Sequence, residues 1–240
     1  MTNSEIISTA NKSGLVEFFN TMVKNGHLAQ QDLSDYQAGK KVFYTADLYV
    51  RKYLGQALSG EIQAITENEV EYLTRCNLSK GRIPDEMNVI MSHFSLRFGE
   101  STTDYSTTPE RVKYTNCIYD LADVVADAGR SAVASTSVFV QRIPNAFING
   151  EYELKCDDGL VDKGRISEHL VNNTATQHVQ GAGDNAKLYY WPKLLPAGKT
   201  LRLTLKFPSS AVSGTDYPAS TYYFVEASVK GMYLGRRPGA

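Results

Sequence analysis

The sequence predicts a mainly β protein built as an antiparallel sandwich, and three kinds of observation support this. Tyrosine and phenylalanine are abundant, with 15 Tyr and 9 Phe against a single Trp, and aromatic side chains are enriched in strands. Apolar and polar residues alternate in several runs, most clearly in TLRLTLKF at 200–207, as expected for a strand with one wet face. Turn-forming residues such as Asn149-Gly150 and Pro196-Ala197-Gly198 separate the runs.

Eight runs are predicted to be the main strands, and a ninth run is ambiguous. The ambiguous run, EIQAITENEVEYLT at 61–74, is interpreted as strand, with a short helix as the alternative. The main strands are expected at residues 40–54, 87–99, 135–143, 147–156, 159–166, 186–191, 200–207 and 221–234.

The run NVIMSHFSLRFGE at 88–100 carries two alternation phases. Val89 and Met91 occupy one phase, whereas Phe94, Leu96 and Phe98 occupy the other. A strand that is covered on both faces, or that is bent by a bulge, loses strict alternation in this way. A layered β protein accounts for either possibility.

Two helices are predicted beside the strands. SGLVEFFNTMVKN at 13–25 places apolar residues on one helical stripe, and a helix of this length needs a surface on which to dock. That surface is its own domain, a neighbouring subunit or a membrane; the candidates for a subunit interface are Leu15, Phe18, Phe19 and Met22. The second helix is predicted at 109–128, because Thr108 is a suitable cap and Pro109 suits the first helical position.

Composition indicates one domain without a basic footprint. We expect a helical arm at 1–39 and a single β domain at 40–240. Lys plus Arg is 25 and Asp plus Glu is 26, so sequence-specific nucleic-acid binding is not expected. No two of Cys76, Cys117 and Cys156 form a C-x-x-C pair, which favours neither zinc nor dithiol chemistry and suits a reducing compartment. Neither a signal peptide nor a run of about 18 apolar residues is evident, so we expect neither export nor a membrane span.

The residue patterns predict neither catalysis nor a cofactor. The four histidines, His27, His93, His169 and His178, have no metal-ligand spacing. No serine nucleophile motif occurs, and Gly181-Ala182-Gly183 is interpreted as a loop tip. Three alternating carboxylates, Glu67, Glu69 and Glu71, are interpreted as a solvated strand face, with a cation between subunits as the alternative. The chain is therefore expected not to be an enzyme and to bind no metal.

The segment GRRPGA contains two adjacent arginines. Arg236 and Arg237 are candidates for contact with nucleic acid or with a partner's carboxylates, and a solvated pair is the simpler interpretation. The near-neutral total suits close self-association, because like-charged subunits repel.

The order of the predicted elements resembles the viral jelly roll. FINGEYELKCDDGLVDKGRI at 147–166 is similar to a strand, turn and strand run in the capsid proteins of small tailless icosahedral bacteriophages, including membrane-containing ones. YYWPKLLPAGKTLRLTLKFPSS at 189–210 and YYFVEASVKGMYLGRR at 222–237 are similar to their closing strands. The resemblance implies strands B to I in two sheets, ordered BIDG and CHEF, with a helix inserted between the second and third main strands.

The same resemblance implies a function. It implies a capsid protein, most simply the major one, that assembles with copies of itself as trimers, pentamers or a shell, with other capsid proteins or an internal membrane as further partners. Such a protein is made in the host cytoplasm and resides in the virion. Two alternatives share the scaffold. One is a receptor- or carbohydrate-binding jelly-roll module of a phage spike or vertex, using Tyr189, Tyr190 and Trp191; the other is a cupin-like enzyme, which would need clustered histidines.

Overall fold

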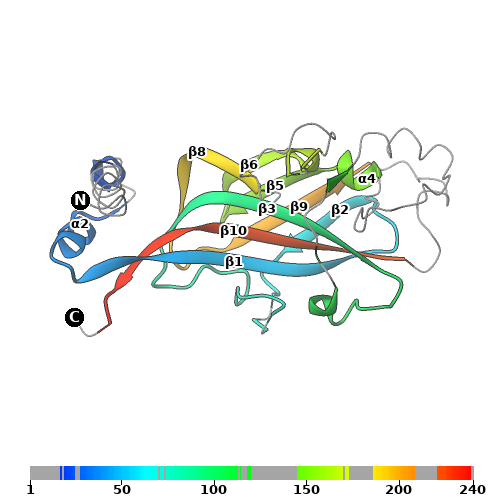
Figure 1. Cartoon of the computed structure of the whole chain (residues 1–240), viewed down its shortest axis with the longest axis horizontal. Helices are drawn as coiled ribbons and strands as arrows, with labels where there is room; N and C mark the ends of the chain where they lie inside the picture. Colours follow the sequence, from blue (N-terminus) through cyan, green and yellow to red (C-terminus); the bar gives the residue numbers. More distant parts are fainter. Residues whose placement is uncertain are drawn as a thin grey trace, which may run out of the picture.

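The computed structural model contains two four-stranded antiparallel sheets and few helices, as the sequence predicts for a β-sandwich (Figure 1). It describes residues 17, 19–24, 28–69, 71–72, 74–112, 114, 118–119, 145–169, 171–172, 186–208 and 221–238. The elements are α2 Gln30–Gln37, β1 Lys41–Gly55, β2 Gly60–Ile65, β3 Val89–Ser101, η1 Pro109–Arg111, β4 Ile118–Tyr119, α4 Asn145–Ile148, β5 Glu151–Cys156, β6 Gly159–Arg165, η3 Ile166–His169, β7 Val171–Asn172, β8 Ala186–Leu195, β9 Leu201–Phe207 and β10 Tyr222–Arg236.

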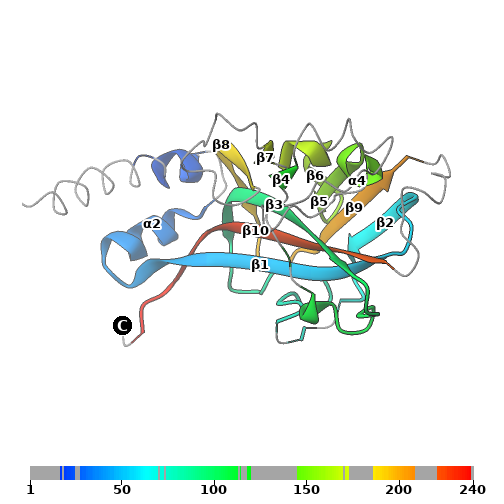
Figure 2. The ribbon, with the colours of Figure 1, turned by 45° about the vertical axis from the view of Figure 1, so that its right-hand side comes forward.

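The two sheets form separate layers. Sheet A has the order β1-β10-β3-β8, and sheet B has the order β2-β9-β5-β6. The long strands β1 and β10 pair along almost their whole length and extend beyond sheet B towards the N-terminal helices (Figures 1 and 2). The short strands β4 and β7 pair in parallel apart from both sheets.

The apolar core lies between the sheets. Sheet B contributes Leu201, Leu203 and Leu205 from β9, all fully buried, while Arg202 between them is exposed. The alternation predicted for 200–207 is therefore confirmed. Sheet A contributes side chains such as Phe94, whose ring contacts Tyr152 of sheet B with centroids 5.3 Å apart. Burial of such side chains stabilises each by about 1.5–3 kcal/mol relative to exposure.

A β-bulge in β3 explains the two phases of residues 88–100. On β10, Lys230 pairs with His93 and Gly231 pairs with Met91, so Ser92 is the extra residue. The bulge lets Val89 and Met91 on one side of it, and Phe94, Leu96 and Phe98 on the other, face the same core. The outer face of β3 also carries a buried apolar residue, Ile90.

Two helical segments cover one end of the outer face of sheet A. Residues 19–24, which lie within the helix predicted at 13–25, are helical, and α2 follows them. Phe19 is fully buried, with its ring centroid 5.3 Å from Tyr36 and 5.0 Å from Phe43. The arm cluster comprises Phe19, Met22, Leu28, Leu33 and Ile90.

The free edge of β1 is covered by the chain itself. Arg51 N–H donates to the Arg75 carbonyl at 2.9 Å, and Asn77 N–H donates to the Tyr49 carbonyl at 3.2 Å. The Asn77 side chain also accepts from Tyr49 N–H at 2.7 Å. In this way residues 75–77 satisfy edge groups of β1 that would otherwise be open to another strand.

Four predicted strands need correction or fall outside the described residues. The ambiguous run at 61–74 is strand only up to Ile65 and supplies β2 to sheet B. The run at 87–99 is consequently the third strand of the two sheets in chain order, not the second. The predicted strand at 135–143 lies outside the described residues.

The run at 147–156 does not begin as a strand. Asn145–Ile148 forms the short helix α4, because Phe147 is fully buried between the layers, 4.8 Å from the ring of Phe98. Gly150 then allows the chain to enter β5: a Cβ there would lie 2.8 Å from the Ile166 side chain. The remaining predicted strands correspond to β1, β6, β8, β9 and β10 within a few residues.

The helix predicted at 109–128 is wrong over its described part. Pro109–Arg111 forms a single 3-10 turn, after which Val112 is extended and buried. Tyr114 donates its hydroxyl to the Pro109 carbonyl at 2.9 Å, which fixes the chain across the turn. Ile118–Tyr119 is a strand, as suits a β-branched and an aromatic residue. Residues 120–128 lie outside the described part of the chain.

No helix in the described ranges is long and apolar enough to cross a membrane.

Candidate functional site

A buried carboxylate joins the two sheets where the edge strands β6 and β8 face each other. Asp162 of β6 accepts a hydrogen bond from the Tyr152 hydroxyl at 2.7 Å and another from the Tyr189 hydroxyl of β8. The Lys187 ammonium of β8 lies 3.3 Å from the same carboxylate and 2.9 Å from that of Glu168. We call Tyr152, Asp162, Glu168, Lys187 and Tyr189 the seam cluster.

Each ionisable group of the seam cluster keeps a single protonation state near neutral pH. Burial by itself would raise the pKa of Asp162, but hydrogen bonds from both tyrosines and the nearby lysines hold it below its usual value. Burial and the Asp162 carboxylate raise the pKa of Tyr152 and of Tyr189. Burial opposes the charge of Lys187, yet its hydrogen bonds to Tyr152 and Glu168 raise its pKa. The cluster is therefore an ion network that ties the sheets together, not a proton-exchange site.

A buried histidine lies next to the seam cluster. His169 is 1% exposed, and its ring meets Phe94 and Tyr152 edge-on at 5.1 and 4.8 Å. Burial lowers its pKa to about 4, with a smaller contribution from the Lys187 charge. Neither ring nitrogen has a hydrogen bond of good geometry among the described residues. The imidazole is thus neutral and acts as an aromatic core residue.

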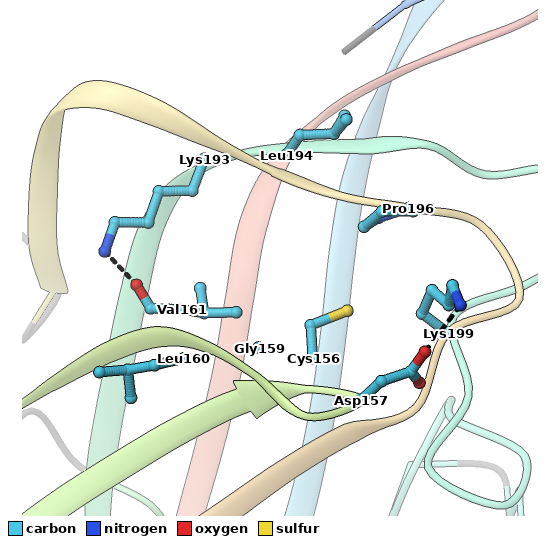
Figure 3. Close-up of a pocket in the computed structure, with 9 residues that line it drawn as sticks. All are labelled: Cys156, Asp157, Gly159, Leu160, Val161, Lys193, Leu194, Pro196 and Lys199. Atoms are coloured by element: carbon cyan, nitrogen blue, oxygen red, sulfur yellow. Dashed lines mark hydrogen bonds and ion pairs between the residues drawn. The ribbon is translucent and has the colours of Figure 1, made fainter. Parts of the chain in front are cut away.

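A hollow of about 490 Å³ opens beside the seam, between the β5–β6 turn and the end of β8 (Figure 3). Its lining mixes apolar side chains with two lysines, as Figure 3 shows: Cys156, Asp157, Gly159, Leu160, Val161, Lys193, Leu194, Pro196 and Lys199. Both lysines are already paired, Lys199 with Asp157 at 2.8 Å and Lys193 with the Val161 carbonyl. Burial raises the pKa of the Cys156 thiol, so this group is not an activated nucleophile.

A second ion cluster lies on the outer face of sheet A. Glu226 of β10 is 6% exposed and bridges Arg51 of β1, at 2.7 Å, and Arg97 of β3, at 3.2 Å. The Arg51 guanidinium also lies 5.4 Å from the ring centroid of Tyr114. Glu226 and its two arginines thus span the adjacent strands β1, β10 and β3. Their ion pairs hold the side chains of these strands in register on a face that loops partly cover.

The predicted interface residues and the predicted basic contact residues do not lie together in the structure. Phe19 and Met22 are buried against their own chain, whereas Leu15 and Phe18 lie outside the described residues. Docking on the parent domain was one of the alternatives, and contact of this helix with a neighbouring subunit stays a prediction. Arg236 and Arg237 are exposed at the end of β10.

The histidines and the aromatic run do not form one site. His93 bonds to Ser92 at the bulge, and His169 lies in the core, while His27 and His178 are outside the described residues. Tyr189 points to the seam cluster, which counts against it as part of a sugar platform. The side chains of Tyr190 and Trp191 are outside the described set.

The glutamates at 67, 69 and 71 do not share a solvated strand face. Glu69 is 5% exposed and pairs with Lys52 at 2.6 Å, while Glu67 pairs with Arg202. They follow the end of β2, so a turn directs each one differently. Within the described ranges, no group of three or more His, Cys, Asp or Glu residues could hold a metal ion.

Sequence reasoning missed the seam cluster. Lys187 and Tyr189 of β8 lie 25 and 27 positions after Asp162 of β6 in the sequence. The available signal was an acid in the middle of the strand GLVDKGR, directly after Leu160 and Val161.

Comparison with protein-family models, with curated proteins and with solved structures finds no match to this chain.

Proposed function

We propose that this chain is a jelly-roll capsid protein of a bacteriophage, the major subunit of an icosahedral shell. It assembles with copies of itself in the virion, after synthesis in the host cytoplasm, and its further partners are other capsid proteins or an internal membrane. One support for this proposal is the resemblance of residues 147–166, 189–210 and 222–237 to such proteins. Fold alone does not define function, so the assembly test below carries the decision.

The strand order of the two sheets is the observation that carries the proposal. When the eight strands of sheets A and B receive the letters B to I in chain order, β2 is C and β3 is D. The order β1-β10-β3-β8 then reads BIDG, and β2-β9-β5-β6 reads CHEF. These are the two orders that the resemblance implies, with β2 as the second strand and β3 as the third, where the sequence predicts the runs at 87–99 and 135–143 in these places.

The edges of the sandwich support an assembly of defined geometry. Residues 75–77 cover the edge of β1, and the seam cluster ties the edge strands β6 and β8 together. Covered edges disfavour open-ended strand pairing between chains. Subunits with such edges associate through side-chain surfaces, which can produce closed shells.

The mass of the purified protein tests the proposal directly. We expect trimers, pentamers or shells in light scattering and electron microscopy, growing with protein concentration. A strict monomer at the highest soluble concentration contradicts the proposal. Binding on a glycan array that Trp191→Ala abolishes, together with a monomeric mass, would favour a carbohydrate-binding module instead.

A further inference from the structure

Three exposed cations meet at one end of the β1–β10 ribbon. The last paired residues are Lys41 and Arg236, and Arg237 N–H donates to the Lys40 carbonyl at 2.9 Å, which extends the ladder by one more pair. Lys40, Arg236 and Arg237 are all exposed. Residues nearly 200 positions apart in sequence therefore present their charges together, close to the start of β1 (Figure 1).

These cations have no carboxylate partner among the residues that the structure describes, in contrast to their neighbour. Lys41 pairs with Asp32 at 2.6 Å and Asp35 at 3.7 Å on α2, which neutralise it. The charge that remains at the ribbon end is thus carried by Lys40, Arg236 and Arg237. Exposed cations in this arrangement are free to contact an anion from outside.

A pair of aromatic rings lies on the same ribbon, three residue pairs from Lys41 and Arg236. Tyr44 and Tyr233 are cross-strand partners, half-buried and stacked with centroids 5.4 Å apart and an interplanar angle of 26°. The Tyr44 ring packs against Gly235, since a Cβ there would be 2.9 Å from two of its ring carbons. Tyr44 also donates its hydroxyl to the Arg236 carbonyl at 3.1 Å, which orients the ring towards the cations.

Strand alternation aligns the two features. Tyr44 pairs with Tyr233 and Val42 with Gly235, so the next row on that face is Lys40 with Arg237. Rows on one face of a strand are two residues, or about 7 Å, apart. The cationic row is thus two rows, about 14 Å along the backbone, from the aromatic row. The Tyr44 side chain shortens this gap, because its hydroxyl reaches the Arg236 carbonyl.

We propose that this ribbon end, formed by Lys40, Tyr44, Tyr233 and Arg237, binds single-stranded nucleic acid without sequence specificity. The cations contact phosphates, and arginine does so with paired donors. The tyrosine pair stacks on a base, which requires an unpaired base with an open face. Double-stranded DNA offers phosphates but no such open base face. Anionic lipid offers phosphates but no base that could stack on the tyrosines. The inference does not depend on the proposed capsid role.

Fluorescence anisotropy with a labelled oligo-dT at several salt concentrations tests the site. The wild-type protein binds it, and affinity falls with salt by about 0.7 log units per tenfold salt for each phosphate contacted. The double variant Lys40→Ala with Arg237→Ala binds more weakly, with the salt slope smaller by about 1.4. Tyr233→Leu lowers affinity roughly tenfold with an unchanged slope, because stacking carries no charge.

A matched control removes the same charge elsewhere. Lys163 and Arg165 are exposed cations on the edge strand β6, so Lys163→Ala with Arg165→Ala should bind oligo-dT as the wild type does. Circular dichroism and thermal melts of every variant show that the fold is kept.

Several outcomes would overturn the assignment. They are no binding by the wild type at low salt, an equal loss in the β6 control, and duplex DNA binding as tightly as oligo-dT. Tighter binding to vesicles containing phosphatidylglycerol than to oligo-dT, at equal phosphate concentration, would assign the ribbon end to a lipid surface instead.

Discussion

At the scale of single residues, the bulge in β3 depends on a glycine in the neighbouring strand. Ser92 is the extra residue, and the backbone of β3 approaches β10 at Gly231. A Cβ at Gly231 would lie 2.0 Å from the Ile90 carbonyl oxygen, which no side chain tolerates. The bulge turns Phe94, Leu96 and Phe98 into the core, so this glycine determines which face of β3 is apolar.

Gly231→Ala should therefore destabilise the protein by about 3 kcal/mol or more, because backbone atoms of two central strands must separate. Gly60→Ala is the matched control: Gly60 has a φ of +68° but nothing within 4 Å of its Cβ position. Its expected cost is only the left-handed conformation, about 1–2 kcal/mol. Urea denaturation measures both. Equal costs in the two variants would contradict the close contact at the bulge.

His169 gives the stability a defined pH dependence. Its pKa is near 6.5 in an unfolded chain and is lowered by burial to about 4 in the folded protein. Between these values the unfolded state binds the additional proton, so the free energy of unfolding falls as the pH is lowered from about 6.5 to about 4. This contribution is fully present above pH 6.5 and lost at acidic pH.

The corresponding variant is His169→Phe, which keeps an aromatic ring between Phe94 and Tyr152. From pH 7.5 to pH 5, the wild type should lose about 2 kcal/mol through this imidazole. The variant should lose that much less over the same interval, measured by urea denaturation at both pH values. An identical pH dependence in the two proteins would show that His169 is not held neutral.

At the scale of elements, the seam cluster replaces backbone pairing with side-chain bonds. Strands β6 and β8 belong to different sheets, and Asp162 connects them through Tyr189 and Lys187. The Asp162 side chain is 10% exposed, so its partners depend on it for hydrogen bonds that water does not replace.

Asp162→Asn removes the charge but keeps the shape, and it should destabilise the protein by about 2–3 kcal/mol. Its control is Glu61→Gln, since Glu61 is 67% exposed and lies 3.4 Å from Lys206. The exposed pair should contribute less than about 1 kcal/mol. Thermal and urea melts compare the two substitutions. A loss in Asp162→Asn no larger than in the control would mean that the seam does not hold the sheets together.

The elements also show what the sequence could predict and what it could not. β9 lies between β2 and β5 with one wet face, so its alternation was readable from 201–207 alone. The two phases of β3 required knowledge of its partner, because the bulge is defined by pairing with β10. Thr108 and Pro109 favour the start of a helix, but the same residues suit the 3-10 turn that forms.

The seam cluster could not be predicted from the sequence for the same reason. Each of its side chains is ordinary in its own strand, and only the approach of β6 to β8 makes them a network.

At the scale of the whole molecule, sheet A is covered on both faces by its own chain. Sheet B packs on the inner face, while the arm cluster covers one end of the outer face. The outer face of sheet B is charged and alternates cleanly, as in β9. If copies associate as proposed, they have to use side-chain surfaces other than the buried stripe of the arm. Neighbouring positions on a helix are rotated by about 100°.

Two substitutions in the arm separate folding from assembly. Phe19→Ala removes a ring that is fully buried against Tyr36 and Phe43, so it should cost about 3–4 kcal/mol and release the arm from sheet A. Phe18→Asp, one position earlier in the sequence, is predicted to leave the melting temperature within a few degrees of wild type while abolishing oligomers. Light scattering and thermal melts read the two effects independently. Oligomers of unchanged mass in Phe18→Asp would refute helix docking on a neighbour, and the fold of sheet A would be unaffected by that result.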